Sequence, residues 1–205
     1  MLKLVALITM IIDHIGLYFG IQPFRLVGRL SFPIYCFLIN RGIKKTKDVK
    51  KYSIRLLALA IISQCIFECI GLGSVINVLF VYFLFIQLMS FVESKNYLVS
   101  SMLLVFIILV SSHLDYGMYG FMMLFMFYYI KDVWVQFFVM LAINMFFINN
   151  GIVNIVQYIS LLSIFIINRY DKPKYYKKFK KFNGLFYWLY PIHLILIYYF
   201  RLYIF

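Results

Sequence analysis

Long apolar runs occupy almost the whole chain, and only short polar breaks separate them. Soluble domains are about half apolar, whereas this chain of 205 residues is 65% apolar and only 13% charged. A water-soluble fold of this length has no interior large enough to hide that surplus, so we expect an integral membrane protein. Soluble enzymes, disordered tails and secreted disulfide scaffolds are excluded. Because no stretch remains for a soluble domain, residues 1–205 are expected to form a single membrane domain.

The apolar runs are continuous rather than alternating, which favours transmembrane helices over barrel strands. Their lengths predict an all-α polytopic bundle of about nine spans. Pro33 is expected to kink the second span. The predicted spans are residues 2–19, 26–40, 53–72, 75–92, 97–112, 118–130, 133–147, 152–168 and 184–205.

The positive charges predict the orientation of these helices. Most of the net charge of +13 falls in two loop clusters, residues 44–55 and 169–181. Together with the loops at Lys95 and Lys131, both clusters lie on the cytoplasmic side if the N-terminus is cytoplasmic. This topology explains the excess of lysine and arginine without a nucleic-acid partner. We therefore expect a multi-pass protein of the cell membrane, with the lipid bilayer around it.

The three cysteines predict neither disulfides nor a metal site. Cys36, Cys65 and Cys69 all lie in apolar runs, and their spacing matches no disulfide framework or metal-ligand pattern. We interpret them as small apolar side chains. No metal cofactor is therefore expected.

Ionisable and amide side chains fall at one depth of the predicted bundle. At about 1.5 Å per residue, Asp13 and His14 lie roughly 17–18 Å from the inner end of the first span. Gln64, Arg29 and His193 lie at roughly 14–18 Å on three other spans. Buried polar groups are costly in a bilayer, so such a layer predicts a functional site.

The layer also suggests local pairs. Arg25 and Arg29 are four residues apart and share a helix face, and Asp13 is expected to neutralise Arg29. His14 points about 100° away from Asp13, so it is expected to serve a different partner. Under the alternative interpretation, Asp13 and Arg29 form only an interhelical pair, and the two histidines merely hydrogen-bond between helices.

Several motifs resemble those of TraX-type membrane proteins, in the expected order along nearly the whole chain. The most specific are residues 9–16 (TMIIDHIG) and 25–34 (RLVGRLSFPI). The others are 37–38 (FL), 41–42 (RG), 62–64 (ISQ), 77–80 (NVLF), 115–120 (DYGMYG) and 190–194 (YPIHL).

This resemblance implies a bacterial membrane acyltransferase. The family's namesake acetylates the N-terminus of a conjugative pilin. The implied reaction moves an acetyl group from acetyl-CoA to an amine, such as a peptide N-terminus, or to a hydroxyl of a peptide or small-molecule acceptor. Acetyl-CoA is then the acyl donor.

The polar layer fits acyl transfer, which needs a base and a donor to the developing oxyanion. His14 or His193 can be the base, and if the first and last helices are neighbours the two imidazoles flank one cavity. We assign His14 as the base, with Asp13 fixing its surroundings through Arg29, and expect His193 to orient or protonate the leaving thiolate. Arg29 or Gln64 would donate to the oxyanion. Arg41 and the basic loops would attract the CoA phosphates on the cytoplasmic side. The remaining predicted substrate-binding residues are Arg25, Asn77, Asp115 and Tyr116.

Two other classes of function stay open at this point. A proton-coupled transporter or a peptide-immunity protein could use the same layer as a proton relay, although no inverted repeat is visible. A purely structural bundle in a secretion complex would leave the layer without a role. The oligomeric state is also open.

Overall fold

The computed structural model describes residues 1–69, 71, 75–151, 153–172 and 183–204. Within these ranges the secondary structure is helical apart from turns and one isolated bridge, which confirms the predicted all-α class. Outside the described residues lie the basic segment 173–181 and one end of three predicted spans, at residues 72, 152 and 205.

The chain divides into two compact units. The first comprises Met1–Leu38 and Phe125–Phe205, and the second comprises Ile39–Leu124. Helices α3 (Ser31–Lys45) and α7 (Gly117–Tyr129) contribute residues to both units.

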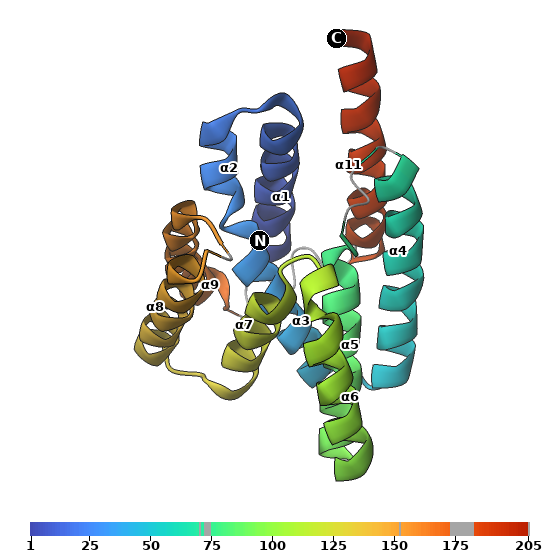
Figure 1. Cartoon of the computed structure of the whole chain (residues 1–205), viewed down its shortest axis with the longest axis vertical. Helices are drawn as coiled ribbons and strands as arrows, with labels where there is room; N and C mark the ends of the chain where they lie inside the picture. The colour runs from blue at the N-terminus through green and yellow to red at the C-terminus, as the bar shows by residue number, and fades with distance from the viewer. Residues whose placement is uncertain (70, 72–74, 152, 173–182, 205) are drawn as a thin grey trace. The chain divides into compact units, whose positions relative to one another are not determined.

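The first unit is built around α1 (Leu2–Phe19), which ends as the sequence predicts. It packs against α2 (Gln22–Gly28), which runs beside it in Figure 1. It also packs against α9 (Leu162–Tyr170) and α11 (Asn183–Ile204). The remaining helical elements are α8 (Val133–Asn149) and the 3-10 helix η2 (Ile155–Leu161). Since η2 packs against α2, α8 and α9, it fills the space between these helices.

Two predicted spans of this unit are interrupted. The span expected at residues 26–40 is broken into α2 and α3 at Arg29 and Leu30. The expected kink at Pro33 is therefore wrong: this proline lies in the first turn of α3, where a missing N–H breaks no helical hydrogen bond. The span expected at 152–168 begins as η2, capped by the Asn154 side chain, and continues as α9.

The second unit contains α4 (Val49–Cys69), α5 (Val78–Glu93) and α6 (Tyr97–Val110), followed by the short 3-10 helix η1 (Ser111–His113). Helix α5 packs between α4 and α6. Outside the helices, Ile76 and Leu114 form a parallel bridge. This bridge joins the segment before α5 to the segment after α6.

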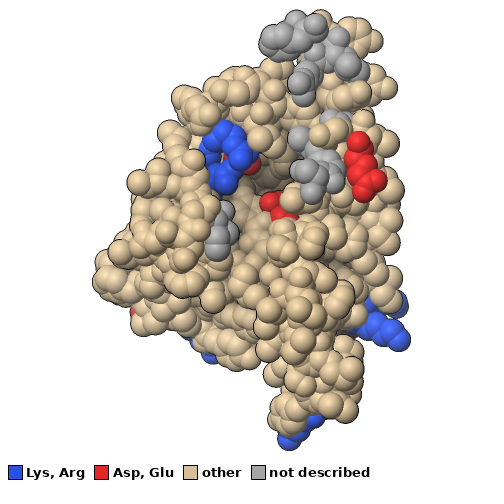
Figure 2. Space-filling model, viewed as in Figure 1, with Lys and Arg blue, Asp and Glu red and all other residues tan. Residues whose placement is uncertain are grey.

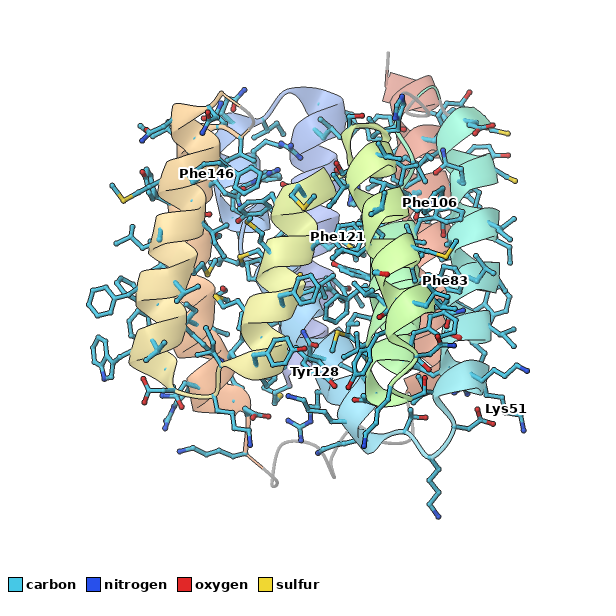
Figure 3. All side chains as sticks on the ribbon, turned by 60° about the horizontal axis from the view of Figure 1, so that its bottom comes forward. Lys51, Phe83, Phe106, Phe121, Tyr128 and Phe146 are labelled. Carbon is cyan, nitrogen blue, oxygen red and sulfur yellow. The ribbon has the colours of Figure 1, made fainter. Side chains whose placement is uncertain are left out.

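Apolar side chains face outward on many of the described helices. By length and composition, α1 and α4 could cross a membrane, and several shorter helices are also apolar. On α6 only Ser100 and Ile107 are buried. Figure 3 labels Phe106 and Phe146, whose side chains are 50% and 57% exposed. Figure 2 shows few charged side chains on the face that it displays.

Candidate functional site

Asp13 is the centre of a charge cluster in the first unit. Its Oδ2 atom accepts a hydrogen bond from Arg25 Nη1 at 2.6 Å, and its Oδ1 atom accepts one from Arg29 Nη2 at 2.9 Å. The Asp13 side chain is 13% exposed, that of Arg29 is 15% exposed and that of Arg25 is 27% exposed. The predicted pair of Asp13 and Arg29 is confirmed, and Arg25 shares the same carboxylate.

A tight turn brings the arginines to Asp13. Gly20 caps α1 in the left-handed conformation at φ 68°, where glycine carries no steric penalty. The chain then returns along α1 as α2. Gly16 allows this close approach, because a Cβ on it would lie 2.8 Å from the Cβ of Phe24. Arg29, which caps α2, also donates from Nε to the Arg25 carbonyl at 3.3 Å.

The cluster carries one negative and two positive formal charges, which leaves a net charge of +1. Opposite charges within a few ångströms stabilise one another strongly where water is scarce. One carboxylate balances only one of the two guanidinium charges, so these three side chains together can stabilise a further negative charge. Its chemistry suits a site at which an oxyanion forms.

His14, on α1, and His193, on α11, meet directly in the first unit. Nδ1 of His14 lies 3.3 Å from Nε2 of His193, and the ring centroids are 5.0 Å apart. His193 is only 4% exposed, and Tyr190 packs edge-on against its ring. Each histidine also contacts a carbonyl of its own helix through Nδ1 at 2.9 Å, His14 that of Met10 and His193 that of Leu189.

Gln64 and Asn77 form an amide network in the second unit. Gln64 Oε1 accepts hydrogen bonds from the backbone N and from Nδ2 of Asn77, both at 2.9 Å. Asn77 Nδ2 also donates to the Ala60 carbonyl, and Asn77 Oδ1 caps α5 by accepting from Leu79 N. Glu68 lies one turn further along α4, with Oε1 3.4 Å from Gln64 Nε2. The network therefore fastens the start of α5 to α4.

Asp115 and Tyr116 lie at a corner of the same unit. The Asp115 backbone N donates to the Ile76 carbonyl at 2.8 Å, next to Asn77 in sequence. Tyr116 and Gly117 both have positive φ, 61° and 39°. Such a conformation is costly for a tyrosine and is kept only where the surroundings hold it. The structure thus brings the Asn77 and Asp115 segments together.

Comparison with known proteins agrees with these motifs. Residues 1–201 match the family described as TraX protein. The chain belongs to the TraX family. It is 36% identical over 69 residues to the "Probable fimbrial assembly protein FimC, serogroup H1" of Dichelobacter nodosus. That match covers 31% of this chain and 28% of the relative. No solved structure matches the chain.

The predicted site residues of this TraX family chain fall into two groups. Asp13, His14, Arg25, Arg29 and His193 come together in the first unit. The second unit contains the others, namely Arg41, Gln64, Asn77, Asp115 and Tyr116. One polar layer through all of these helices stays a prediction.

Arg41 lies on the last turns of α3, close to Lys44 and Lys45. Burial and the neighbouring Arg41 charge both lower the pKa of the Lys45 ammonium. An anion bound beside Arg41 and Lys45 would reduce the repulsion between these two cations.

Two glycines that allow close helix packing in the first unit were not predicted from the sequence. Gly16 and Gly28 let α2 approach α1, and only their place inside the matched motifs could have indicated it. The sharing of Asp13 by both arginines was also missed. The spacing of four residues between Arg25 and Arg29 was the available signal.

Proposed function

We propose that this TraX family chain is a multi-pass membrane acetyltransferase that moves an acetyl group from acetyl-CoA to an amine or hydroxyl. One observation carries the proposal: the helix that supplies the carboxylate of the arginine cluster also carries His14, whose ring contacts that of His193 on α11. A base and a cationic group are the two components that acyl transfer requires.

The exposed apolar surface supports a membrane location. Helix α6 is apolar on nearly every side, with Leu98 and Leu109 72% and 71% exposed. A helix that is apolar all round is stable when protein or lipid covers it. A bilayer would cover α6 without a partner protein. We propose several spans, with the N-terminus on the cytoplasmic side.

In the proposed reaction, His14 removes the proton of the acceptor amine or hydroxyl. The acceptor then attacks the carbon of the acetyl carbonyl, and the carbonyl oxygen gains negative charge. Arg25 and Arg29 stabilise that oxyanion. The carbon–sulfur bond breaks, the acetyl group stays on the acceptor, and the CoA thiolate takes up the proton from His14. Gln64 suits the oxyanion role less well, because its amide holds the start of α5.

The cationic stretch at the end of α3 supports a place for the CoA phosphates. Arg41 and Lys45 repel one another, and a phosphate would relieve that repulsion. Arg41→Ala is expected to weaken acetyl-CoA binding several-fold, and added salt should weaken it further. Calorimetric titration tests this, with the exposed Lys131→Ala as the matched control. Unchanged affinity in Arg41→Ala would place the phosphates elsewhere.

The relative from Dichelobacter nodosus is described as a fimbrial assembly protein. That description supports an acceptor of the pilin type, which would offer the α-amine of a membrane peptide. We therefore place the N-terminal amine of a peptide first among the acceptors and a hydroxyl second.

Acetyl transfer from purified protein tests the proposal. The protein in nanodiscs would receive acetyl-CoA carrying a deuterated acetyl group, together with a peptide that has a free α-amine and a hydroxyl-bearing sugar. Mass spectrometry detects the labelled product. Thiol release without a labelled product reports reaction with water as the acceptor. Labelled product from either acceptor supports the proposal. Protein that binds acetyl-CoA but releases no thiol and labels no acceptor contradicts it, and proton uptake into sealed vesicles would then favour a transporter.

A further inference from the structure

The contact between the two histidines defines where their protons lie. A carbonyl oxygen only accepts hydrogen bonds, so the ring nitrogen that contacts it must carry the proton. Nδ1 of His14 contacts the Met10 carbonyl and Nδ1 of His193 contacts the Leu189 carbonyl, both at 2.9 Å. In their neutral forms both rings are therefore protonated at Nδ1, which leaves the lone pair on Nε2.

The hydrogen bond between the rings has one direction under this assignment. His14 Nδ1 carries the proton and His193 Nε2 carries the lone pair, 3.3 Å away. His14 therefore donates to both the Met10 carbonyl and His193, as a three-centre hydrogen bond. The reverse direction would place the lone pair of His14 Nδ1 against the Met10 carbonyl oxygen, which is repulsive.

We propose that His193 is a positioning residue that holds His14 in the Nδ1–H form, so that His14 Nε2 takes the acceptor's proton. This inference rests on the proposed acetyl transfer. As His14 becomes an imidazolium, its Nδ1–H donates more strongly to His193 Nε2, which stabilises the charge. His14 Nε2 then returns the proton to the departing CoA thiolate, so the pair ends the cycle as it began.

The second role considered for His193, protonation of the leaving thiolate, does not fit this geometry. In the neutral ring the Nδ1 proton is committed to the Leu189 carbonyl, and Nε2 has no proton to give. His193 is also 4% exposed, with Nε2 directed at His14. It therefore acts through His14 rather than on the substrate.

The tautomers are measurable without any substrate. The chain has three histidines, so the 15N spectrum of the labelled imidazoles is simple. His113→Gln removes the signals of the one exposed histidine in the described part of the chain. We expect protonated Nδ1 and unprotonated Nε2 for His14 and His193 at a pH where both are neutral. A protonated Nε2 on either ring would overturn the inference, whether or not the protein transfers acetyl groups.

Two substitutions of His193 separate positioning from proton donation. His193→Gln keeps a hydrogen-bond acceptor near the place of Nε2 but has no proton to transfer as an acid. His193→Leu removes the acceptor. We expect His193→Leu to lower turnover about 10-fold or more and to mix the His14 tautomers, as losses of an orienting partner do. His193→Gln should recover part of that turnover and the Nδ1–H form.

The outcomes of this comparison are decisive. If His193→Gln is as slow as His193→Leu while His14 stays protonated at Nδ1, proton transfer by His193 is required and positioning is refuted. If His193→Leu keeps normal turnover, the contact has no catalytic role. Acetyl-CoA affinity and the melting temperature identify a variant that fails to fold, and the spectrum of the unsubstituted chain then still tests the inference. An unsubstituted protein with the expected tautomers but no acetyl transfer would contradict the proposed function alone.

Discussion

Gly28 lies against the Asp13 carboxylate, and only a hydrogen atom fits between them. A Cβ on Gly28 would overlap the Oδ1, Cγ and Cβ atoms of Asp13. The backbone of α2 therefore forms one wall of the charge cluster. This contact explains why the cluster requires glycine at its centre.

Gly28→Ala is expected to lower the stability of the protein. Alanine favours a helix over glycine by about 1 kcal/mol, but the overlap with Asp13 forces a shift that costs about 1–3 kcal/mol. It also moves the carboxylate, so acetyl transfer should fall. Melting temperature and turnover in nanodiscs measure both effects. Gly151→Ala is a control for destabilisation alone, because its φ of 68° disfavours alanine while a Cβ there meets no atom within 4 Å. Equal losses of activity in both variants would contradict the prediction.

The charge cluster predicts an order of stability among three substitutions. Asp13→Asn leaves two guanidiniums without a carboxylate and should cost about 3–5 kcal/mol. Arg25→Gln leaves a neutral pair of Asp13 and Arg29, so its cost should be smaller. The loss of stability in Arg29→Gln should lie between those of the other two variants, because Arg29 is less exposed than Arg25. Thermal unfolding of the three variants ranks them, and a larger loss in Arg25→Gln than in Asp13→Asn would refute the charge argument.

His14→Ala is expected to lower acetyl transfer on the order of 10²-fold or more, as removal of a general base does. Acetyl-CoA binding should persist, because the base contacts the acceptor rather than the phosphates. His113→Ala is the matched control: His113 is exposed in the second unit, and its Nδ1 lies 3.2 Å from Ser112 Oγ. A folded His14→Ala protein with near-normal turnover would disprove the assignment.

Asn77→Ala separates a structural role from a binding role. Loss of the helix cap alone costs about 0.5–2 kcal/mol, and the bonds to Ala60 and Gln64 are lost with it. We expect a lower melting temperature and an unchanged acetyl-CoA affinity of the folded fraction. Calorimetric titration with acetyl-CoA below the melting temperature distinguishes the two roles. Weaker acetyl-CoA binding at that temperature would assign Asn77 to the binding site.

Cysteine labelling tests the predicted topology. Single cysteines at Lys47 and at Asn150, both exposed, should react from opposite sides of the membrane. The background must lack Cys65 and Cys69, which are exposed, and Cys36, which is buried. A reagent that cannot cross the membrane should label Asn150 in whole cells and Lys47 only in opened cells. Labelling of both from one side would reject the nine-span arrangement.

The sequence predicted the helices and one ion pair well, because both follow from local patterns. The bounds of α1 agree at both ends, and depth along the helices indicated the pair of Asp13 and Arg29. The break at Arg29 was not predictable from apolarity, since the run continues through Leu30. Hydrogen bonding of Arg29 to Asp13 and Arg25, seen only after folding, accompanies that break.

Contacts between distant segments were less accessible to sequence reasoning. The meeting of His14 and His193 was expected only if the first and last helices were neighbours, which depth alone does not establish. Gln64 and Asn77 were both selected as binding residues, yet their contact uses the amide groups to join α4 and α5. Side-chain spacing within one helix carries no information about such partners.

The two halves of the candidate site also differ in when they can form during synthesis. Asp13 is 12 residues from Arg25 and 16 from Arg29, whereas His14 is 179 residues from His193. N-terminal segments emerge first from the ribosome, so the charge cluster can close as soon as α1 and α2 have been synthesised. The histidine pair can form only after α11 has been synthesised. A chain still under synthesis therefore carries its arginines neutralised in part well before α11 brings His193 to His14.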